Sequence, residues 1–238
     1  MPLTAYPGLL AGQGSPYLNL SPLVTTGKMW FVSSVIGRTN NVGDDPLRPI
    51  STLQTAYNKC RANYGDHVII LPGHAENITA AAGINFNIAG VTVIGMGSGA
   101  SRPTFTHTTV AGASWDINAA SNTLANVVIN ATGVAAVTAA MNVKAADFTY
   151  INNRMVLANA TNQAVLGILT TNAASRMRIG GFSQFVDASG PAAGYTVGTT
   201  NAISIVGGDG IVIGDPMGLV QMTGAYDASL GTSRIFVE

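Results

Sequence analysis

Short apolar runs recur from His67 to the end of the chain, separated by glycine, asparagine, serine, threonine and alanine. Almost none of them carries the 3.6-residue period of a helix, and runs this short are typical of strands. Many short strands with turns between them predict an all-β domain, which can be a sandwich, a barrel or a solenoid. The runs are His67–Leu71, Val91–Ile94, Leu124–Ile129, Ala139–Val143, Phe148–Ile151, Val165–Leu169, Met177–Ile179, Ile203–Val206 and Ile211–Ile213.

Two features favour a solenoid, in which successive coils stack along one axis. Several successive runs lie about 20 to 30 residues apart, which is the length of one coil, and about 22 to 25 residues per coil would give about six or seven coils. Asparagine also recurs beside the runs, where its amide can bond to the next coil while its backbone tolerates a left-handed turn. A sandwich would more often show Asn-Gly hairpin turns, and the sequence has none. The asparagines are Asn85, Asn87, Asn118, Asn122, Asn126, Asn130, Asn142, Asn152 and Asn153.

One segment, residues 51–63, has a helical pattern, and Lys28–Ser34 before it is typical of a strand. Ser51 and Gln54 fit a capping box, and Gly65 is a plausible stop. We expect a short helix whose apolar stripe covers another surface. The stripe consists of Leu53, Ala56, Tyr57 and Cys60.

A family resemblance rests on the order of motifs between these elements. Gly43-Asp-Asp-Pro46 leads into Pro49-Ile-Ser-Thr-Leu-Gln-Thr-Ala56, and Gly65-Asp-His-Val-Ile-Ile-Leu-Pro-Gly73 is followed by Glu76-Asn-Ile78 and Gly90-Val-Thr-Val-Ile-Gly95. This order resembles the opening of right-handed parallel β-helix proteins of the pectate-lyase-like type. The resemblance implies a helix that caps the open end of a single-stranded solenoid. It does not imply one activity, because the family includes polysaccharide lyases, hydrolases, bacteriophage tailspikes and other virion parts.

We therefore expect an all-β, right-handed parallel β-helix with an extended N-terminal arm and a short capping helix. The arm is residues 1–27, the strand, loop and capping helix are residues 28–66, and the short β-helix is residues 67–238. Four prolines exclude a long helix or a central strand from the arm. Its apolar content favours contact with a partner over a solvated tail. The candidate contact residues are Tyr6, Leu9, Leu10, Tyr17, Leu18 and Leu20.

Low charge excludes several classes of protein. Only 9% of residues are charged, and 11 basic against 11 acidic residues leave no excess to neutralise nucleic-acid phosphates. A mean hydropathy of +0.32 is too high for a disordered chain. No apolar run approaches the roughly 18 residues of a membrane span. An uncharged surface lacks the repulsion that keeps proteins apart, so the chain is suited to packing among other chains.

The sequence predicts no catalytic residues, no metal site and no cofactor. Polysaccharide cleavage needs clustered carboxylates, and those after residue 80 are scattered. We interpret Asp44 and Asp45 as turn-capping residues. Arg176 and Arg178 would project from one face of a strand, either toward a neighbouring chain or into solvent. Trp30 and Trp115 are either core residues or exposed platforms for sugar rings.

The main functional hypothesis is a non-enzymatic virion structural protein, a bacteriophage capsid decoration (cement) protein. It would form a homotrimer and bind the major capsid protein or other virion proteins through the arm. One alternative is a tail fibre or tailspike module that binds a glycan, and another is a polysaccharide lyase or hydrolase. On the main hypothesis the protein is located in the virion, on the capsid surface or tail, with no nucleic-acid or membrane partner.

Overall fold

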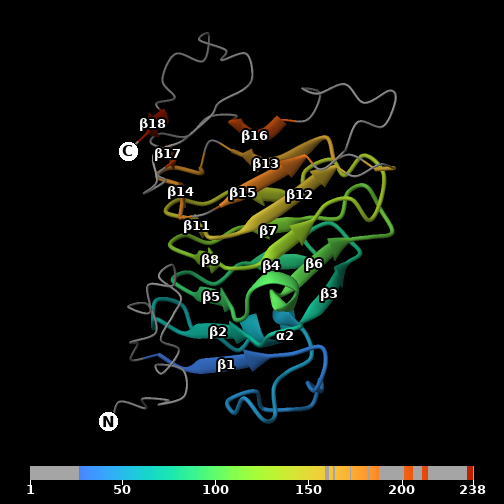
Figure 1. Ribbon diagram of the computed structural model, residues 1–238. Helices are drawn as coiled ribbons and strands as arrows, with labels where there is room; N and C mark the ends of the chain where they lie inside the picture. The colour runs from blue at the N-terminus through green and yellow to red at the C-terminus, as the bar shows by residue number, and fades with distance from the viewer. Residues whose placement is uncertain are drawn as a thin grey trace.

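The chain forms a parallel β-solenoid in three sheets (Figure 1). The computed structural model describes residues 27–158, 161–162, 164–171, 173–181, 183–187, 201–205, 211–213 and 235–237. Every strand pair in these ranges is parallel. Each strand pairs with the equivalent strand of the next coil, so in most of the stack the strand numbers in one sheet rise by three, as in β2, β5 and β8. The fold class expected from the sequence, a parallel β-helix, is confirmed.

Sheet 1 has eight strands and sheets 2 and 3 have five each. Sheet 1 contains β1 (Met29–Val32), β2 (His67–Ile70), β5 (Thr92–Gly95), β8 (Thr123–Ala125), β11 (Thr149–Ile151), β14 (Arg178–Gly180), β17 (Ile211–Ile213) and β18 (Ile235–Val237). Sheet 2 contains β3 (Ala75–Ile78), β6 (Thr104–His107), β9 (Val128–Asn130), β12 (Arg154–Ala158) and β15 (Gln184–Asp187). Sheet 3 contains β4 (Ile84–Phe86), β7 (Trp115–Ile117), β10 (Met141–Val143), β13 (Leu166–Thr170) and β16 (Asn201–Ile205).

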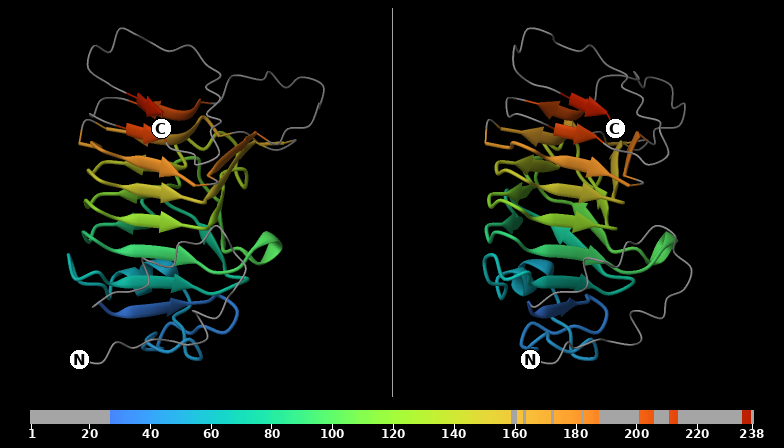
Figure 2. Two further views of the ribbon diagram at one scale, coloured as in Figure 1. Left: turned by 60° about the vertical axis from the view of Figure 1, so that its left-hand side comes forward. Right: turned by 90° about the vertical axis from the view of Figure 1, so that its left-hand side faces the viewer.

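The coils are longer than expected. Along one column of sheet 1, His67 pairs with Thr92, Thr92 with Thr123, Thr123 with Thr149 and Thr149 with Arg178. The steps are 25, 31, 26 and 29 residues, whereas we expected about 22 to 25. The described strands therefore make fewer coils than expected: β2 to β13 form four consecutive coils, and β14 to β16 continue the three sheets. Figure 2 shows sheet 1 as a ladder of stacked strands.

Side chains that alternate inward along each strand fill the solenoid. In sheet 1 one buried column is Val68, Val93, Leu124, Tyr150 and Ile179. Aromatic rings join the sheets near the N-terminal end. There the Trp115 ring lies edge-on to Phe86 and to Phe105, with centroids 5.8 and 4.9 Å apart. Trp115 is fully buried and Trp30 is 8% exposed, so both are core residues and not exposed platforms.

The helix expected over residues 51–63 is much shorter. It is α2, Leu53–Tyr57, and Thr52 occupies the N-cap position without a side-chain capping bond. The expected capping box is therefore wrong. The i to i−4 ladder ends at Asn58, because the Lys59 and Cys60 N–H groups donate to the carbonyls of Ala56 and Tyr57, three residues earlier. The Arg61 N–H then donates to the Asp66 carboxylate, 2.8 Å away. A second short turn, η2, is a 3₁₀ helix at Gly99–Ser101.

Asparagines connect adjacent coils mainly through the backbone. Asn126 has φ 57° and donates from Nδ2 to the Gly95 and Gly97 carbonyls of the preceding coil, 2.7 and 3.0 Å away. Buried Asn153 donates to the Leu124 carbonyl at 2.8 Å and accepts the Val127 N–H at 2.9 Å. The left-handed turns and the bonds along the stack agree with the expectation, although most partners are backbone groups.

Candidate functional site

The loop of residues 33–50, here called the base loop, covers the outer edge of β1 (Figure 1). The Phe31 N–H donates to the Gly43 carbonyl at 2.6 Å, and Ile50 donates to the Phe31 carbonyl at 2.8 Å. The Ser33 N–H in turn donates to the Ile50 carbonyl at 2.9 Å. An open edge of a sheet is a template for another strand, so these bonds protect this end of sheet 1 from edge-to-edge association.

The base loop presents most of the exposed large apolar side chains of the described residues. Val35 is 71% exposed, Ile36 54%, Val42 58% and Leu47 82%, whereas elsewhere only Tyr64, Val110 and Val165 belong to this class. Apolar groups collected on one exposed segment are typical of a surface that contacts another protein. The base loop is therefore the candidate functional site.

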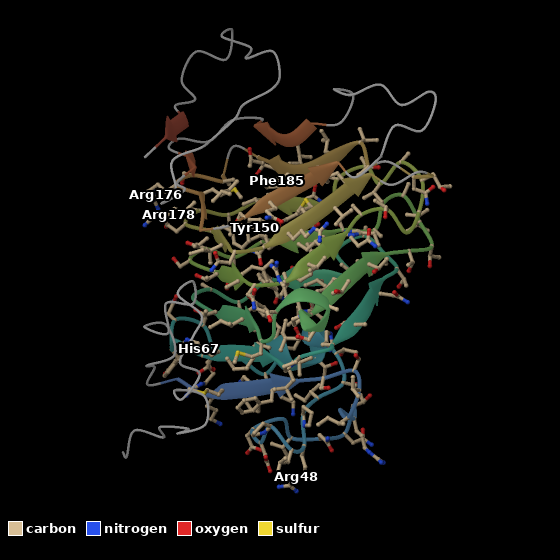
Figure 3. All side chains as sticks on the ribbon, viewed as in Figure 1. Arg48, His67, Tyr150, Arg176, Arg178 and Phe185 are labelled. Atoms are coloured by element: carbon tan, nitrogen blue, oxygen red, sulfur yellow. The ribbon has the colours of Figure 1, made fainter. Side chains whose placement is uncertain are left out.

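Polar contacts hold the base loop in shape. Asn41 donates from Nδ2 to the Pro49 carbonyl at 2.7 Å. The Leu47 N–H donates to Asp45 Oδ1 at 2.8 Å, and the Asp45 carboxylate lies 3.6 Å from Arg48. Asp45 therefore caps a turn, as we interpreted it. Arg48 marks this loop at the lower end of the molecule in Figure 3.

Sequence reasoning did not find this site. The segment from Gly37 to Pro49 is rich in turn-forming residues, and the sequence predicted only a loop with turn-capping residues within 28–66. One feature of the sequence could have indicated the site. Apolar residues such as Val42 and Leu47 stand among turn-forming residues, outside any predicted strand or helix that could bury their side chains. The proposed arm contacts Tyr6, Leu9, Leu10, Tyr17, Leu18 and Leu20 lie outside the described residues.

The four residues of the expected stripe lie in the core, three of them on α2 and Cys60 after its end. Leu53, Ala56 and Tyr57 are fully buried and Cys60 is 8% exposed. The Tyr57 ring stacks on Phe86 with centroids 4.6 Å apart, and its hydroxyl donates to the Ile88 carbonyl at 2.6 Å. Burial, together with the nearby Asp66 charge, raises the pKa of the Cys60 thiol to about 12. Cys60 is therefore a structural residue that stays protonated, not a nucleophile.

Arg176 and Arg178 do not act as a pair. Arg176 lies in the turn before β14 with φ 54° and binds Asp147 one coil away, with Nε to Oδ1 at 2.7 Å and Nη2 to Oδ2 at 2.6 Å. This ion pair lowers the pKa of the exposed Asp147 carboxyl. Arg178 lies on β14 and is exposed on the outer face of sheet 1, beside Thr149. Figure 3 shows both arginines at the same margin of the solenoid.

A ladder of polar side chains covers part of the outer face of sheet 3. Asn85, Asp116 and Asn142 stack in register on β4, β7 and β10. Asn118 donates to Asn85 Oδ1 and Asn142 donates to Asp116 Oδ1, both at 2.9 Å. The members of this ladder already bond to one another, so a ligand would have to compete with these bonds.

Asp116 carries the charge of this ladder and is only 7% exposed. It accepts the Ser114 hydroxyl at 2.9 Å and the Lys144 ammonium at 2.5 Å, in addition to Asn142. Burial alone would raise the pKa of the Asp116 carboxyl, but these hydrogen bonds outweigh burial and the pKa is lowered. The carboxylate is therefore ionised and held by fixed partners, which is typical of a structural role.

The histidines are buried and bonded to the protein. The imidazole of His74 accepts the Ser34 N–H on Nδ1 at 2.9 Å, so its Nε2 carries the proton and donates to Glu76 at 3.0 Å. His107 contacts the Ala140 carbonyl at 3.0 Å. In the described ranges no three His, Cys, Asp or Glu side chains gather where they could hold a metal ion.

Comparison with known proteins found no family model, curated protein or solved structure that matches the chain. Among the described residues no helix has the length and apolar content to span a membrane.

Proposed function

We propose that the protein is a non-enzymatic structural component of a virion, a bacteriophage capsid decoration protein that attaches by its N-terminal end. The observation that carries the proposal is the base loop, whose Val35, Ile36, Val42 and Leu47 are exposed at that end of the solenoid. The sequence motifs resemble a β-helix family that includes virion parts among lyases and hydrolases, and the low overall charge suits a chain that packs among others. The major capsid protein, or another virion protein, is the proposed partner.

Attachment would act by mass action. A protein that binds only the assembled shell lowers the free energy of the assembled state relative to its free subunits. Apolar contacts contribute roughly 25 cal/mol for each Å² removed from water, and they need no opposite charge on the partner. A trimer, which belongs to the same proposal, would present three base loops to one surface and raise its avidity.

The arrangement of the carboxylates supports a role without catalysis. Asp66 is held by Arg61 at 2.8 Å, Asp116 by Lys144 and Asp147 by Arg176, each on a different part of the solenoid. Glycosidases instead keep two carboxyl groups about 5 to 9.5 Å apart across a substrate. In the described residues these three carboxylates are therefore engaged in separate ion pairs, and two of the pairs link adjacent coils.

The test uses particles assembled from the genome that encodes this chain. Immunogold labelling should find the protein on intact particles, and the double variant Val42→Asp, Leu47→Asp should remain folded yet be absent from them. Val110→Asp is the matched control, because Val110 is also exposed but lies outside the base loop. Particles that keep the double variant would contradict attachment through the base loop. If the protein binds a glycan array but is absent from the particles, the tail-fibre alternative is favoured. If it releases sugar products from a polysaccharide, the enzyme alternative is favoured.

A further inference from the structure

One column of side chains on the outer face of sheet 1 is apolar and is buried beside β1, next to a more polar column that runs from His67 to Arg178. Residues alternate between the two faces of a strand, so with Trp30 and Val68 in the core, Phe31 and Ile69 project outward. Both outward side chains nevertheless have no exposed surface. They belong to a second cluster, separate from the core, that consists of Phe31, Ile69, Ile94 and Ala125 with Met29, Leu71, Met96 and Ile151 packed against it.

Burial of this outer face decreases with distance from β1. Phe31, Ile69, Ile94 and Ala125 form one register column, and their exposed fractions are 0%, 0%, 5% and 8%. The next residue of the column, Ile151, is half-buried. One face of a sheet is fully buried only where a further layer of the protein covers it. The layer that buries this column, here called the cover, is therefore most complete over β1 and less complete toward β11.

We propose that residues 1–26 of the same chain form this cover. Residue 26 is followed by Gly27 and Lys28, and the chain reaches the outer cluster at Met29. Lys28 is fixed at this edge, because its N–H donates to Asp66 Oδ1 at 2.7 Å and its carbonyl accepts the His67 N–H at 2.8 Å. The preceding residues therefore begin where the outer face is most completely buried.

The composition of residues 1–26 fits this position. The segment has no Asp, Glu, Lys, Arg or His, so it can cover apolar side chains without removing a charge from water. Its prolines prevent it from pairing as a regular strand, so it would lie across the sheet as a separate layer. In an extended segment Leu18 and Leu20 would point to the same side.

The segment is also long enough. Extended, 26 residues reach up to roughly 85 Å. Four neighbouring strands from β1 to β8 span only about 14 Å. The segment can therefore cover the buried part of the column with length to spare. The inference does not depend on the proposed capsid attachment, since it concerns the free protein.

Thiol accessibility in the full chain tests the proposal. In a Cys60→Ser background, Ala125→Cys places one cysteine on the covered face, and Thr106→Cys places one on the outer face of sheet 2 as the control. The arm substitutions Leu18→Asp and Leu20→Asp should speed maleimide labelling of the residue-125 cysteine by at least about tenfold, because the cover opens locally, and leave the control rate unchanged. An unchanged rate at residue 125 would overturn the proposal.

Cross-linking tests the proposal without the two aspartate substitutions, so it remains informative even if that variant fails to fold. A photoreactive amino acid replaces Leu18, and isotopically labelled and unlabelled copies are mixed before irradiation. Cross-links to residues 67–71 or 92–96 within one copy support the proposal. Cross-links between copies would assign the cover to the arm of a second molecule and overturn it, as would cross-links that fall only on sheets 2 and 3.

Discussion

The Glu76 side chain points into the solenoid, and its Oε2 accepts the backbone N–H of Leu53, 2.8 Å away, at the first turn of α2. Glu76 pairs in register with Phe105, whose side chain lies in the core, so the carboxylate occupies the last position of an inward column. The same oxygen contacts His74 Nε2 at 3.0 Å. A carboxylate from β3 thus does what the expected capping box would have done, and it joins the helix to the first coil.

Glu76→Ala should destabilise the protein by about 2 kcal/mol, because it leaves two buried donors, the Leu53 N–H and His74 Nε2, without an acceptor. Glu76→Gln keeps an oxygen acceptor and should cost less. Urea unfolding measures both. Asn77→Ala on the same strand is exposed and should change the free energy of unfolding by less than about 0.5 kcal/mol. Equal effects of all three substitutions would show that the bond to α2 does not stabilise the fold.

Stability should fall as the pH is lowered below the ordinary histidine pKa of 6.5, and His107 should account for part of the fall. Burial lowers the pKa of His107 in the folded state, although hydrogen bonds to the Ala140 and Asn130 carbonyls oppose it. The unfolded chain therefore binds the proton more readily, and acid favours unfolding. Urea unfolding at pH 7.5 and 5.5 measures the fall. It should be smaller in His107→Gln, and an equal fall in the variant would count against this assignment.

Asp116→Ala should cost about 1 to 3 kcal/mol, since Ser114, Asn142 and Lys144 lose a shared, nearly buried acceptor. Because the pKa of Asp116 is lowered on folding, this contribution is present at neutral pH and is lost as the pH falls below the ordinary value of 3.8. Asp147→Ala breaks an exposed ion pair and should cost less than about 1 kcal/mol. Chemical denaturation at pH 7 compares the two, and a larger loss for Asp147→Ala would contradict the prediction.

Gly95→Ala should destabilise the stack by more than about 2 kcal/mol, because the strain of close backbone contact cannot relax. A Cβ at Gly95 would lie 2.3 Å from the Asn126 carbonyl oxygen of the next coil. Gly112→Ala is the matched control, since a Cβ there meets nothing within 4 Å. Thermal and urea unfolding of both variants checks this. Similar stabilities would mean that the two coils can separate at this point without cost.

Much of the strand pattern was predictable from apolar runs, as at β2, β5 and β11. The run Leu124–Ile129, however, folds as two strands, β8 and β9, because Asn126 adopts a left-handed conformation and turns the chain between sheets. Seven strands lie outside the predicted apolar runs: β3, β4, β6, β7, β12, β15 and β18. In β7 the apolar pattern is interrupted by Asp116, which bonds to the outer polar ladder, whereas Trp115 beside it fills the core.

The candidate site was harder to predict than the fold. Exposure of Val35 and Leu47 depends on how the base loop folds over β1, and no local pattern encodes that contact. The dense basic spot at Arg176 and Arg178 was visible in the sequence, but the partner of Arg176 is Asp147, 29 residues earlier. Residues that distant become neighbours only when the coil length is set.

The all-β class follows from the sequence alone, since short apolar runs without a helical period form strands. The spacing of the runs and the asparagines beside them favoured a solenoid over a sandwich or a barrel. The sequence also indicated an apolar stripe on one short helix, because side-chain spacing is a local property. The coil length and the capping role of Glu76, in contrast, are set by contacts between distant parts of the chain. The Glu76 cap depends on a hydrogen bond between residues 23 apart in the sequence, Leu53 and Glu76, and the coil length on strand pairs 25 or more apart. Such contacts form only when the strands have stacked.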